Sequence, residues 1–224
     1  MSAIGTSTDC CVVLMMKAPP RSKRRLAGEI GHLATEAAEL LIDCAREDLE
    51  MWPGPVCLAP SAVDEAAALE SVHPDAVIVQ EGDNLGERIN HVNVELADRG
   101  FERQLFIGID CPTLDATYLE QAAAALQDCT TVFGPAVDGG VVLMGVRGQW
   151  PDLAGLPWST ELLFDALYAT CAGAGASAEL LAPLRDVDTL DDLLALRAEL
   201  DGDPRPARKL LARWLAGRAE LDRQ

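Results

Sequence analysis

Short runs of hydrophobic residues alternate along the chain with longer segments in which hydrophobic residues recur at helical spacing. Short apolar runs bounded by turn residues are typical of buried strands, and recurrence every three to four residues is typical of amphipathic helices. The alternation favours an α/β fold with helices packed on a mostly parallel sheet. The runs predict strands at 10–16, 56–59, 76–79, 105–107, 130–134, 141–146 and 179–183, and the periodic segments predict helices at 32–50, 61–70, 85–98, 118–126, 161–170 and 204–223. Ser61 is expected to cap the second of these helices, with Asp64 at its third position in a capping-box-like arrangement.

The segment 104–114, QLFIGIDCPTL, carries a single acidic residue at the end of a predicted strand. Gly108 lets the backbone turn there, Asp110 follows, and Pro112 prevents a helix from starting at once. Ligands of open α/β sheets bind beyond the carboxyl ends of the strands, and hard divalent cations prefer carboxylate oxygens. Asp110 is therefore either a ligand of a phosphate-bound cation or a capping residue that leads into the helix near Asp115.

A basic segment, KAPPRSKRR at 17–25, comes directly after the first predicted strand. A loop stiffened by prolines and carrying fixed cations can bind a diphosphate or triphosphate, with lysine as a point charge and arginine as a bidentate donor. We therefore favour phosphate binding over a localisation-like patch or a solvated loop.

Two further turns carry polar residues at predicted strand ends. The segment EGDNLGER at 81–88 can offer backbone N–H groups and a side-chain amide to a nucleotide, which makes Asn84, Gly86 and Arg88 candidates, although a helix cap explains it equally well. Asp138 precedes Gly139 and Gly140, and taken alone this is a favoured hairpin turn. Together with Asp110 and the basic loop, Asp138 becomes a candidate second ligand of one divalent cation.

The later part of the chain supplies weaker signals. Trp158, in LPWST, is expected to pack over a sugar or base or to staple the next helix, and Ser159 or Thr160 is expected to cap that helix. In RDVDTLDD at 185–192, Asp188 is a candidate metal contact, and the following acids are interpreted as helix-start residues. The amphipathic helix at about 204–223 is expected to dock on the body of the protein or on a second subunit of a homodimer.

Composition limits the class of protein. The 224 residues suit a single domain, and the net charge of −18 argues against nucleic acid as a partner. Seven scattered cysteines without a CxxC pair predict no zinc or redox framework and fit a reducing compartment. Cys111 has no identifiable histidine partner and is interpreted as a packing residue. No window reaches transmembrane length and the first residues lack signal-peptide features, so a soluble cytoplasmic protein is expected.

The segments KAPPRSKRRL, GDNLGERI, IGIDCPTL, FGPAVDGGVVLMGV, PWST and DVDTLDDL occur in an order and spacing that resemble a bacterial glycosyltransferase-like family, often labelled radical-SAM/selenodomain-associated transferase. The family is related to A-type glycosyltransferases and to nucleotidyltransferases. The resemblance covers about 12–194. It implies a Rossmann-like, three-layer nucleotide-diphospho-sugar transferase fold with a mixed, mostly parallel sheet, in one domain spanning 1–224. Two departures concern ligand binding: Lys23-Arg24-Arg25 replaces Lys-Thr-Arg, and Val141-Val142 replaces an aromatic pair.

The resemblance also implies that Lys17, Lys23 and Arg25 face nucleotide phosphates and that Asp110 is the metal-binding acid. The leading hypothesis is a transferase dependent on magnesium or manganese that moves a sugar from a nucleotide-diphospho-sugar to a small acceptor, with Asp138 as a second metal ligand or a base. The alternatives are a nucleotidyltransferase that releases pyrophosphate from an NTP and a non-catalytic nucleotide-binding relative.

Overall fold

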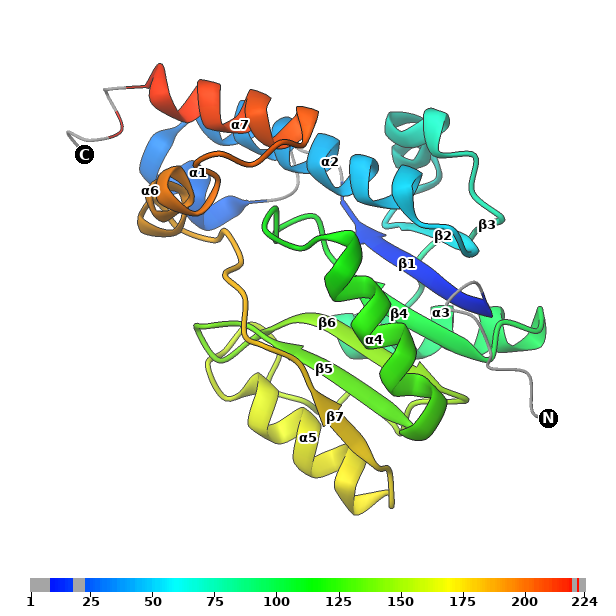
Figure 1. Ribbon diagram of the computed structural model, residues 1–224. Coiled ribbons are helices and arrows are strands. Elements are labelled where there is room, and N and C mark those ends of the chain that lie inside the picture. The colour runs from blue at the N-terminus through cyan, green and yellow to red at the C-terminus, as the bar shows by residue number, and fades with distance from the viewer. Residues whose placement is uncertain (1–8, 18–22, 219–220, 222–224) are drawn as a thin grey trace.

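The computed structural model describes residues 9–17, 23–218 and 221 of the chain (Figure 1). Within these residues, seven strands form one sheet in the order β3-β2-β1-β4-β6-β5-β7. Strand β6 runs antiparallel to β4 and β5, and the other neighbouring strands are parallel. The prediction of a mixed, mostly parallel sheet is confirmed. The strands are β1 (Cys10–Met16), β2 (Val56–Pro60), β3 (Ala76–Val77), β4 (Arg103–Ile107), β5 (Thr131–Pro135), β6 (Val141–Arg147) and β7 (Ala178–Leu180).

Helices cover both faces of the sheet because side chains of the central strands alternate between two buried clusters. In β1, Val12 and Leu14 pack on the face covered by α2 and α4, whereas Cys11 and Val13 pack on the face covered by α3 and α5. All four side chains are fully buried, as expected for a central parallel strand. The covering helices are α2 (Leu33–Met51), α3 (Leu85–Asp98), α4 (Ala116–Asp128) and α5 (Leu163–Gly173).

A third cluster lies outside the sheet layers and consists of helix-to-helix contacts. It joins α2 to α1 (Arg24–Ile30), α6 (Leu190–Glu199) and α7 (Pro206–Ala216), with Leu41 of α2 and Leu211 of α7 fully buried in it. In Figure 1, α7 lies across α2 at the end of the molecule opposite β7 and α5. The predicted docking of the C-terminal helix on the body is confirmed for residues 206–216.

Arg208 of α7 has a fully buried side chain, and it connects the C-terminal helix to the loop after β4. Its guanidinium donates to the carbonyl oxygens of Pro112 (2.9 Å) and Leu114 (3.1 Å). It also donates to carboxylates of α2, at 3.1 Å from Glu47 and in a short contact with Asp48. A buried guanidinium is tolerated only when it is paired in this way, and the pairing ties three segments together.

Several predicted elements differ in detail from the structure. The segment after β2 is a 3₁₀ helix, η3 (Val63–Val72), and Ser61 does not cap it. Instead the carboxylate of Glu65 accepts from the Ser61 N–H and hydroxyl, so the acid that reaches back is Glu65 and not Asp64. Strands β3 and β7, which lie at the two edges of the sheet, are shorter than predicted.

The predicted start of α5 was wrong, and helix α1 was not predicted. Helix α5 begins at Leu163, and its N-cap Leu162 makes no side-chain capping bond, although the Thr160 hydroxyl accepts from the Leu162 N–H at 3.3 Å. Helix α1, directly after the basic segment, was not predicted because its few apolar residues are hidden among cations. It starts at Arg24, and its N-cap Lys23 has left-handed backbone dihedral angles (φ 54°, ψ 42°).

No helix in the described residues is long and apolar enough to cross a membrane.

Candidate functional site

The loops that carry the predicted site residues meet at one edge of the sheet. Strands β1, β2, β3, β4, β5 and β7 all run in the same direction, so the residues that follow them lie at their common carboxyl edge. Backbone hydrogen bonds join these loops: for example, the Val187 N–H donates to the Asp110 carbonyl (2.9 Å), and the Val137 N–H donates to the Leu184 carbonyl (3.1 Å). The chain from β7 to α6 thus passes the ends of both β4 and β5, as Figure 1 also shows.

Lys23 is the cation at the centre of this edge. Its side chain is only 3% exposed, and its ammonium lies 2.9 Å from Asp110 Oδ2 and 3.4 Å from Asp188 Oδ1. It also donates to the Val187 carbonyl oxygen. Burial lowers the pKa of Lys23, whereas the two carboxylates together raise it by a larger amount. The pKa therefore lies above its ordinary value, and the ammonium stays charged.

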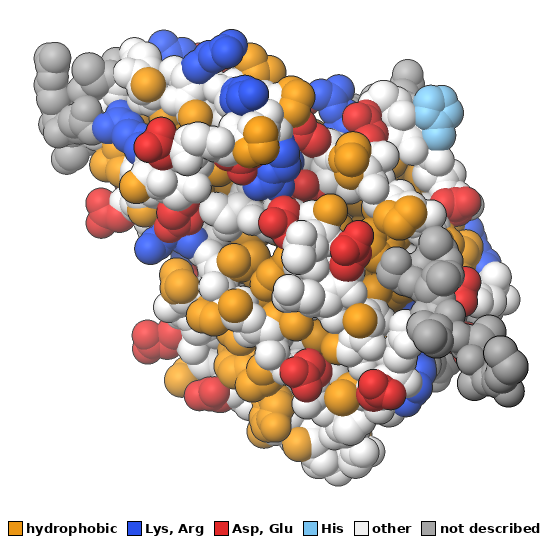
Figure 2. Space-filling view, viewed as in Figure 1, with side chains coloured by type: hydrophobic (Ala, Val, Ile, Leu, Met, Phe, Trp, Pro, Cys, Tyr) orange, Lys and Arg blue, Asp and Glu red, His pale blue; other side chains and the backbone are white. Residues whose placement is uncertain are grey.

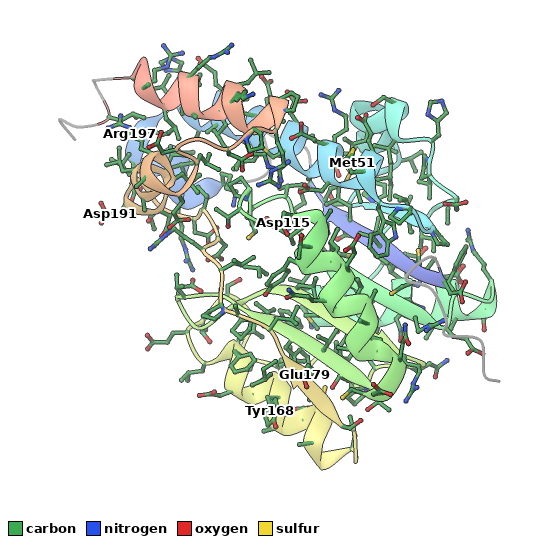
Figure 3. The ribbon with its side chains drawn as sticks, viewed as in Figure 1. Met51, Asp115, Tyr168, Glu179, Asp191 and Arg197 are labelled. Atoms are coloured by element: carbon green, nitrogen blue, oxygen red, sulfur yellow. The ribbon has the colours of Figure 1, made fainter. Side chains whose placement is uncertain are left out.

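Asp110 therefore forms an ion pair and does not cap the next helix. The cap of α4 is Asp115, labelled in Figure 3, whose Oδ1 accepts from the Tyr118 N–H at 2.8 Å. This excludes the capping interpretation of Asp110, and its binding of a phosphate-bound cation stays a prediction. The structure also changes the role of Gly108, since a Cβ added there would lie 2.6 Å from Asp110 Oδ1. Gly108 makes room for the Asp110 carboxylate.

Arg25 lies at the exposed rim of the same cluster. Its guanidinium is 3.5 Å from Asp188 Oδ2 and donates to the Ser159 carbonyl at 3.3 Å. Ser159 has a positive φ of 64°, which is uncommon for a residue other than glycine and marks a locally strained turn. The PWST segment is thereby connected to the basic segment after β1.

Asp186 is the acidic residue of this edge that the sequence analysis did not single out. Burial raises its pKa to about 7, and the negative charges of Asp138, Asp188 and Asp110 raise it as well. This mutual repulsion indicates that four aspartates share one region. The signal in the sequence is the alternation of Asp186 and Asp188 in RDVDTLDD, which directs both acids to the same side of an extended segment.

Asp138 was interpreted from the sequence either as a hairpin-turn residue or as a candidate ligand of a divalent cation. Its carboxylate accepts from the Gly140 N–H at 2.9 Å, as expected of a turn residue. It is also exposed and raises the pKa of Asp186. The turn packs against the start of α5, because a Cβ at Gly139 would lie 2.2 Å from the Glu161 carbonyl oxygen. The structure therefore brings Asp138 to the acidic region while leaving it in a hairpin turn.

The acidic residues have the donor chemistry of a site for a hard divalent cation. Carboxylate oxygens are the ligands that Mg²⁺ and Mn²⁺ prefer, and a cation would relieve the repulsion that raises the pKa of Asp186. Among the described residues, no three His, Cys, Asp or Glu side chains are arranged closely enough to hold a metal ion. The carboxylates Asp110 and Asp188 are instead paired with Lys23. The residues thus fit a cation by their chemistry, with Lys23 as their present counter-ion.

The segment 81–88 lies at the same edge but is occupied with its own fold. Asn84 caps α3 by accepting from the Glu87 N–H (3.0 Å), and the Arg88 guanidinium donates to the Gly82 carbonyl (2.9 Å). A Cβ on Gly86 would lie 2.1 Å from the Leu153 carbonyl oxygen, so this glycine permits close packing of two loops. Contact of Asn84, Gly86 and Arg88 with a nucleotide stays a prediction.

The remaining candidates have simpler surroundings. Lys17 is exposed directly after β1. The indole N–H of Trp158 donates to the Leu153 carbonyl at 2.9 Å, in the segment that precedes it, so packing over a sugar or base and stapling of α5 both stay predictions. Burial raises the pKa of Cys111 to about 11, so its thiol stays protonated, as expected for a packing residue. Of the two departures from the family pattern, the Arg24 side chain lies outside the described residues, and Val142 is buried in the core.

The strand order with its antiparallel β6, and the charged loops at the carboxyl edge, define a nucleotide-diphospho-sugar transferase fold. A protein of Desulfovibrio desulfuricans G20, provisionally described as a nucleotide-diphospho-sugar transferase, superposes with a TM-score of 0.83 at 24% identity over 97% of this chain and 98% of that one. A cytidylyltransferase of Leptospira borgpetersenii superposes at 0.54 with 12% identity over 95% of both chains. A CMP:2-keto-3-deoxy-manno-octonic acid synthetase complexed with CTP superposes at 0.52 with 13% identity, over 86% and 98%.

The chain belongs to the family described as "Uncharacterized protein conserved in bacteria (DUF2064)", whose model matches residues 44–160. The matched part contains Asp110 and Asp138 but not Lys23 or Asp188. No curated protein matches the chain.

Proposed function

We propose that the protein is a metal-dependent transferase that binds a nucleotide-activated donor, a nucleotide-diphospho-sugar, and moves its sugar to a small acceptor. The observation that carries this proposal is the ion cluster of Lys23, Arg25, Asp110 and Asp188 at the carboxyl edge of the sheet. Cations from the loop after β1 and acids from the loops after β4 and β7 are combined there in a fold shared with proteins named as transferases. The closer relation to radical-SAM/selenodomain-associated transferases stays a prediction.

The roles of the side chains follow from their charge and exposure. Lys17 and Arg25 are exposed and would pair with the donor's phosphates, while the buried Lys23 contributes positive charge from beneath the Asp110 carboxylate. The segment 81–88, with Asn84 and Arg88, would lie along the nucleoside. A divalent cation, Mg²⁺ or Mn²⁺, when held by Asp110 with help from Asp188, would neutralise negative charge on the diphosphate.

In the proposed transfer, an acceptor oxygen forms a bond to the anomeric carbon of the sugar. The bond between that carbon and the diphosphate oxygen breaks, and its electron pair leaves with the nucleoside diphosphate. The acceptor proton passes to Asp138, whose exposed carboxylate is available as a base. Lys17 and Arg25 stabilise the charge that develops on the leaving group.

Isothermal titration with nucleoside diphosphates, with and without Mn²⁺, tests the proposal. We expect binding that depends on Mn²⁺ and weakens about tenfold or more in Asp110→Asn, the loss of about 1.4 kcal/mol of binding free energy. Asp128→Asn is the matched control, because Asp128 is exposed at the far end of α4. Equal binding by the wild type and Asp110→Asn would remove the metal role of Asp110.

A second candidate is a nucleotidyltransferase, in which a phosphorylated acceptor attacks an NTP and pyrophosphate leaves. It is favoured by the fold shared with a cytidylyltransferase and with a synthetase complexed with CTP. Product assays separate the two activities. Release of nucleoside diphosphate from a sugar-nucleotide panel supports the sugar transferase, and release of pyrophosphate from an NTP panel supports the nucleotidyltransferase. A protein that binds nucleotide and gives neither product would be a non-catalytic relative.

A further inference from the structure

The Lys23 ammonium uses its full hydrogen-bonding capacity within the protein. An ammonium has three N–H donors, and three acceptors surround this one: Asp110 Oδ2 at 2.9 Å, Asp188 Oδ1 at 3.4 Å and the Val187 carbonyl oxygen. Its side chain is 3% exposed, whereas those of Asp110 and Asp188 are 39% and 38% exposed. The positive charge is therefore buried beneath two carboxylates that remain accessible from solvent.

This arrangement affects any cation that approaches the same carboxylates. Two positive charges on one carboxylate repel each other, and the repulsion is screened little when one of them is buried. Asp110 is the residue proposed to hold the divalent cation, and one of its oxygens already accepts from Lys23. The buried ammonium must therefore weaken the binding of a second cation at Asp110.

We propose that Lys23 makes cation binding depend on the nucleotide: its ammonium holds Asp110 and Asp188 in the cation-free protein, so that a divalent cation alone binds weakly and binds well only together with nucleotide phosphates. The inference rests on the proposed function and deepens it. The phosphates offset the charge of Lys23, and by linkage the cation strengthens nucleotide binding by the same factor. The exposed Arg25, 3.5 Å from Asp188, adds to the positive charge that phosphates would offset.

The discriminating measurement is the affinity for Mn²⁺ alone, by isothermal titration, in variants that remove the charge of Lys23. Lys23→Met and Lys23→Gln have side chains of similar length, and glutamine keeps an N–H donor. We expect both to bind Mn²⁺ about 5- to 150-fold more tightly than the wild type, the usual range of coupling between two sites. Added nucleoside diphosphate should then change their Mn²⁺ affinity much less than it changes that of the wild type.

Lys209→Met controls for the change in net charge, because Lys209 is an exposed residue of α7 outside the site. Circular dichroism and the melting temperature in chelator show which of the two Lys23 variants is folded. An Mn²⁺ affinity in the folded variant equal to or below that of the wild type overturns the inference, since Lys23 would then help to position the acids. If the wild type binds no nucleotide, the proposed function fails, but the comparison with Mn²⁺ alone still measures the effect of Lys23.

Discussion

The Asp110 carboxylate depends on Gly108 for its position. The carboxylate folds back over the glycine two residues before it, in the space that a Cβ would occupy. The other carboxylate oxygen accepts from Lys23, so both oxygens of Asp110 have defined surroundings. A glycine at this position therefore serves the orientation of a neighbouring acid and not a turn with positive φ.

Gly108→Ala is expected to disturb the site while leaving the fold intact. The added Cβ would lie 2.6 Å from Asp110 Oδ1, and the end of a side chain can move away more easily than backbone. We expect Mn²⁺-dependent binding of nucleoside diphosphate to weaken about tenfold, with a change in unfolding free energy below about 1 kcal/mol. Gly173→Ala is the control, because a Cβ there meets no atom within 4 Å. Unchanged binding in Gly108→Ala would contradict this account of Asp110.

Asp186→Asn should change how stability depends on pH in the presence of chelator. The pKa of Asp186 is about 7 in the folded protein, above its value of about 4 in an unfolded chain. The folded state therefore binds the proton more tightly than the unfolded state, and the free energy of unfolding falls as the pH rises from about 4 to about 7. Asparagine removes this loss. After screening by solvent, the gain in the free energy of unfolding at pH 8 is about 1 kcal/mol. We therefore expect the variant to melt about 2–4 °C higher than the wild type at pH 8, and we expect this difference to shrink towards pH 5.

Thermal melting between pH 5 and pH 8 measures this difference. A variant whose gain in melting temperature is the same at both ends of the range would show that Asp186 is not under electrostatic strain in the folded protein.

The loop after β4 is held from outside the sheet by the C-terminal helix. Arg208 donates to the carbonyl oxygens of Pro112 and Leu114, and Arg205 also donates to the Leu114 carbonyl, at 2.6 Å. Both arginines contact Asp48 of α2. Helix α7 thus fixes the segment that immediately follows Asp110, even though it comes almost a hundred residues later in the chain.

Replacing Arg208 by methionine is expected to lower the free energy of unfolding by about 3–5 kcal/mol, the cost of leaving a buried partner charge uncompensated. The loss leaves Glu47 and Asp48 with one cation fewer, and it removes one donor from each of the Pro112 and Leu114 carbonyl oxygens, which then keep only their contacts with Arg205. Urea unfolding measures it. Arg213→Met, at an exposed position on the same helix, should stay within about 0.5 kcal/mol of the wild type. A similar small effect for Arg208 would show that α7 does not stabilise the loop.

The protein as a whole combines distant parts of the chain at a single site. Lys23 and Asp188 lie 165 positions apart and form an ion pair, and strand β1, from the start of the chain, lies between β2 and β4. The surface also differs between its two ends: Figure 2 shows Lys and Arg side chains gathered over α7, and hydrophobic side chains over the part near β7 and α5, where Tyr168 and Leu180 are 41% and 48% exposed. On the face shown, the basic side chains are thus concentrated over α7.

A fragment of residues 44–160, the part that the family model matches, is expected not to fold by itself. It lacks β1, which pairs with both β2 and β4, and it lacks β7 and most of the helices of the third cluster. Far-UV circular dichroism and urea unfolding should show little ordered structure in the fragment and a cooperative transition in the whole chain. A cooperative transition in the fragment would contradict a single domain spanning the chain.

The strands and long helices were predicted well because their signals are local. β1 and α3 begin and end as predicted, since an uninterrupted apolar run and a capped amphipathic repeat depend on neighbouring residues only. The start of α5 and the cap of η3 were wrong, because competing polar residues stood within two or three positions of each other. Asp186 was missed for a different reason, since its importance comes from the charges of three aspartates in other loops or positions.

The amino-acid sequence alone predicted the class of fold, the basic segment after β1 and the place of Asp110 at the end of a buried strand. These features depend on hydrophobic periodicity and on residue types at strand ends, which are local properties of the sequence. Only the tertiary structure decided that Lys23 is buried against Asp110 and Asp188, and that Asp186 lies in the same acidic region. It also decided that Arg208 holds the loop after β4. The contacts of Lys23 and Arg208 join residues 87 to 165 positions apart, and the energy of a charge depends on what surrounds it in space and not only on its neighbours in the chain.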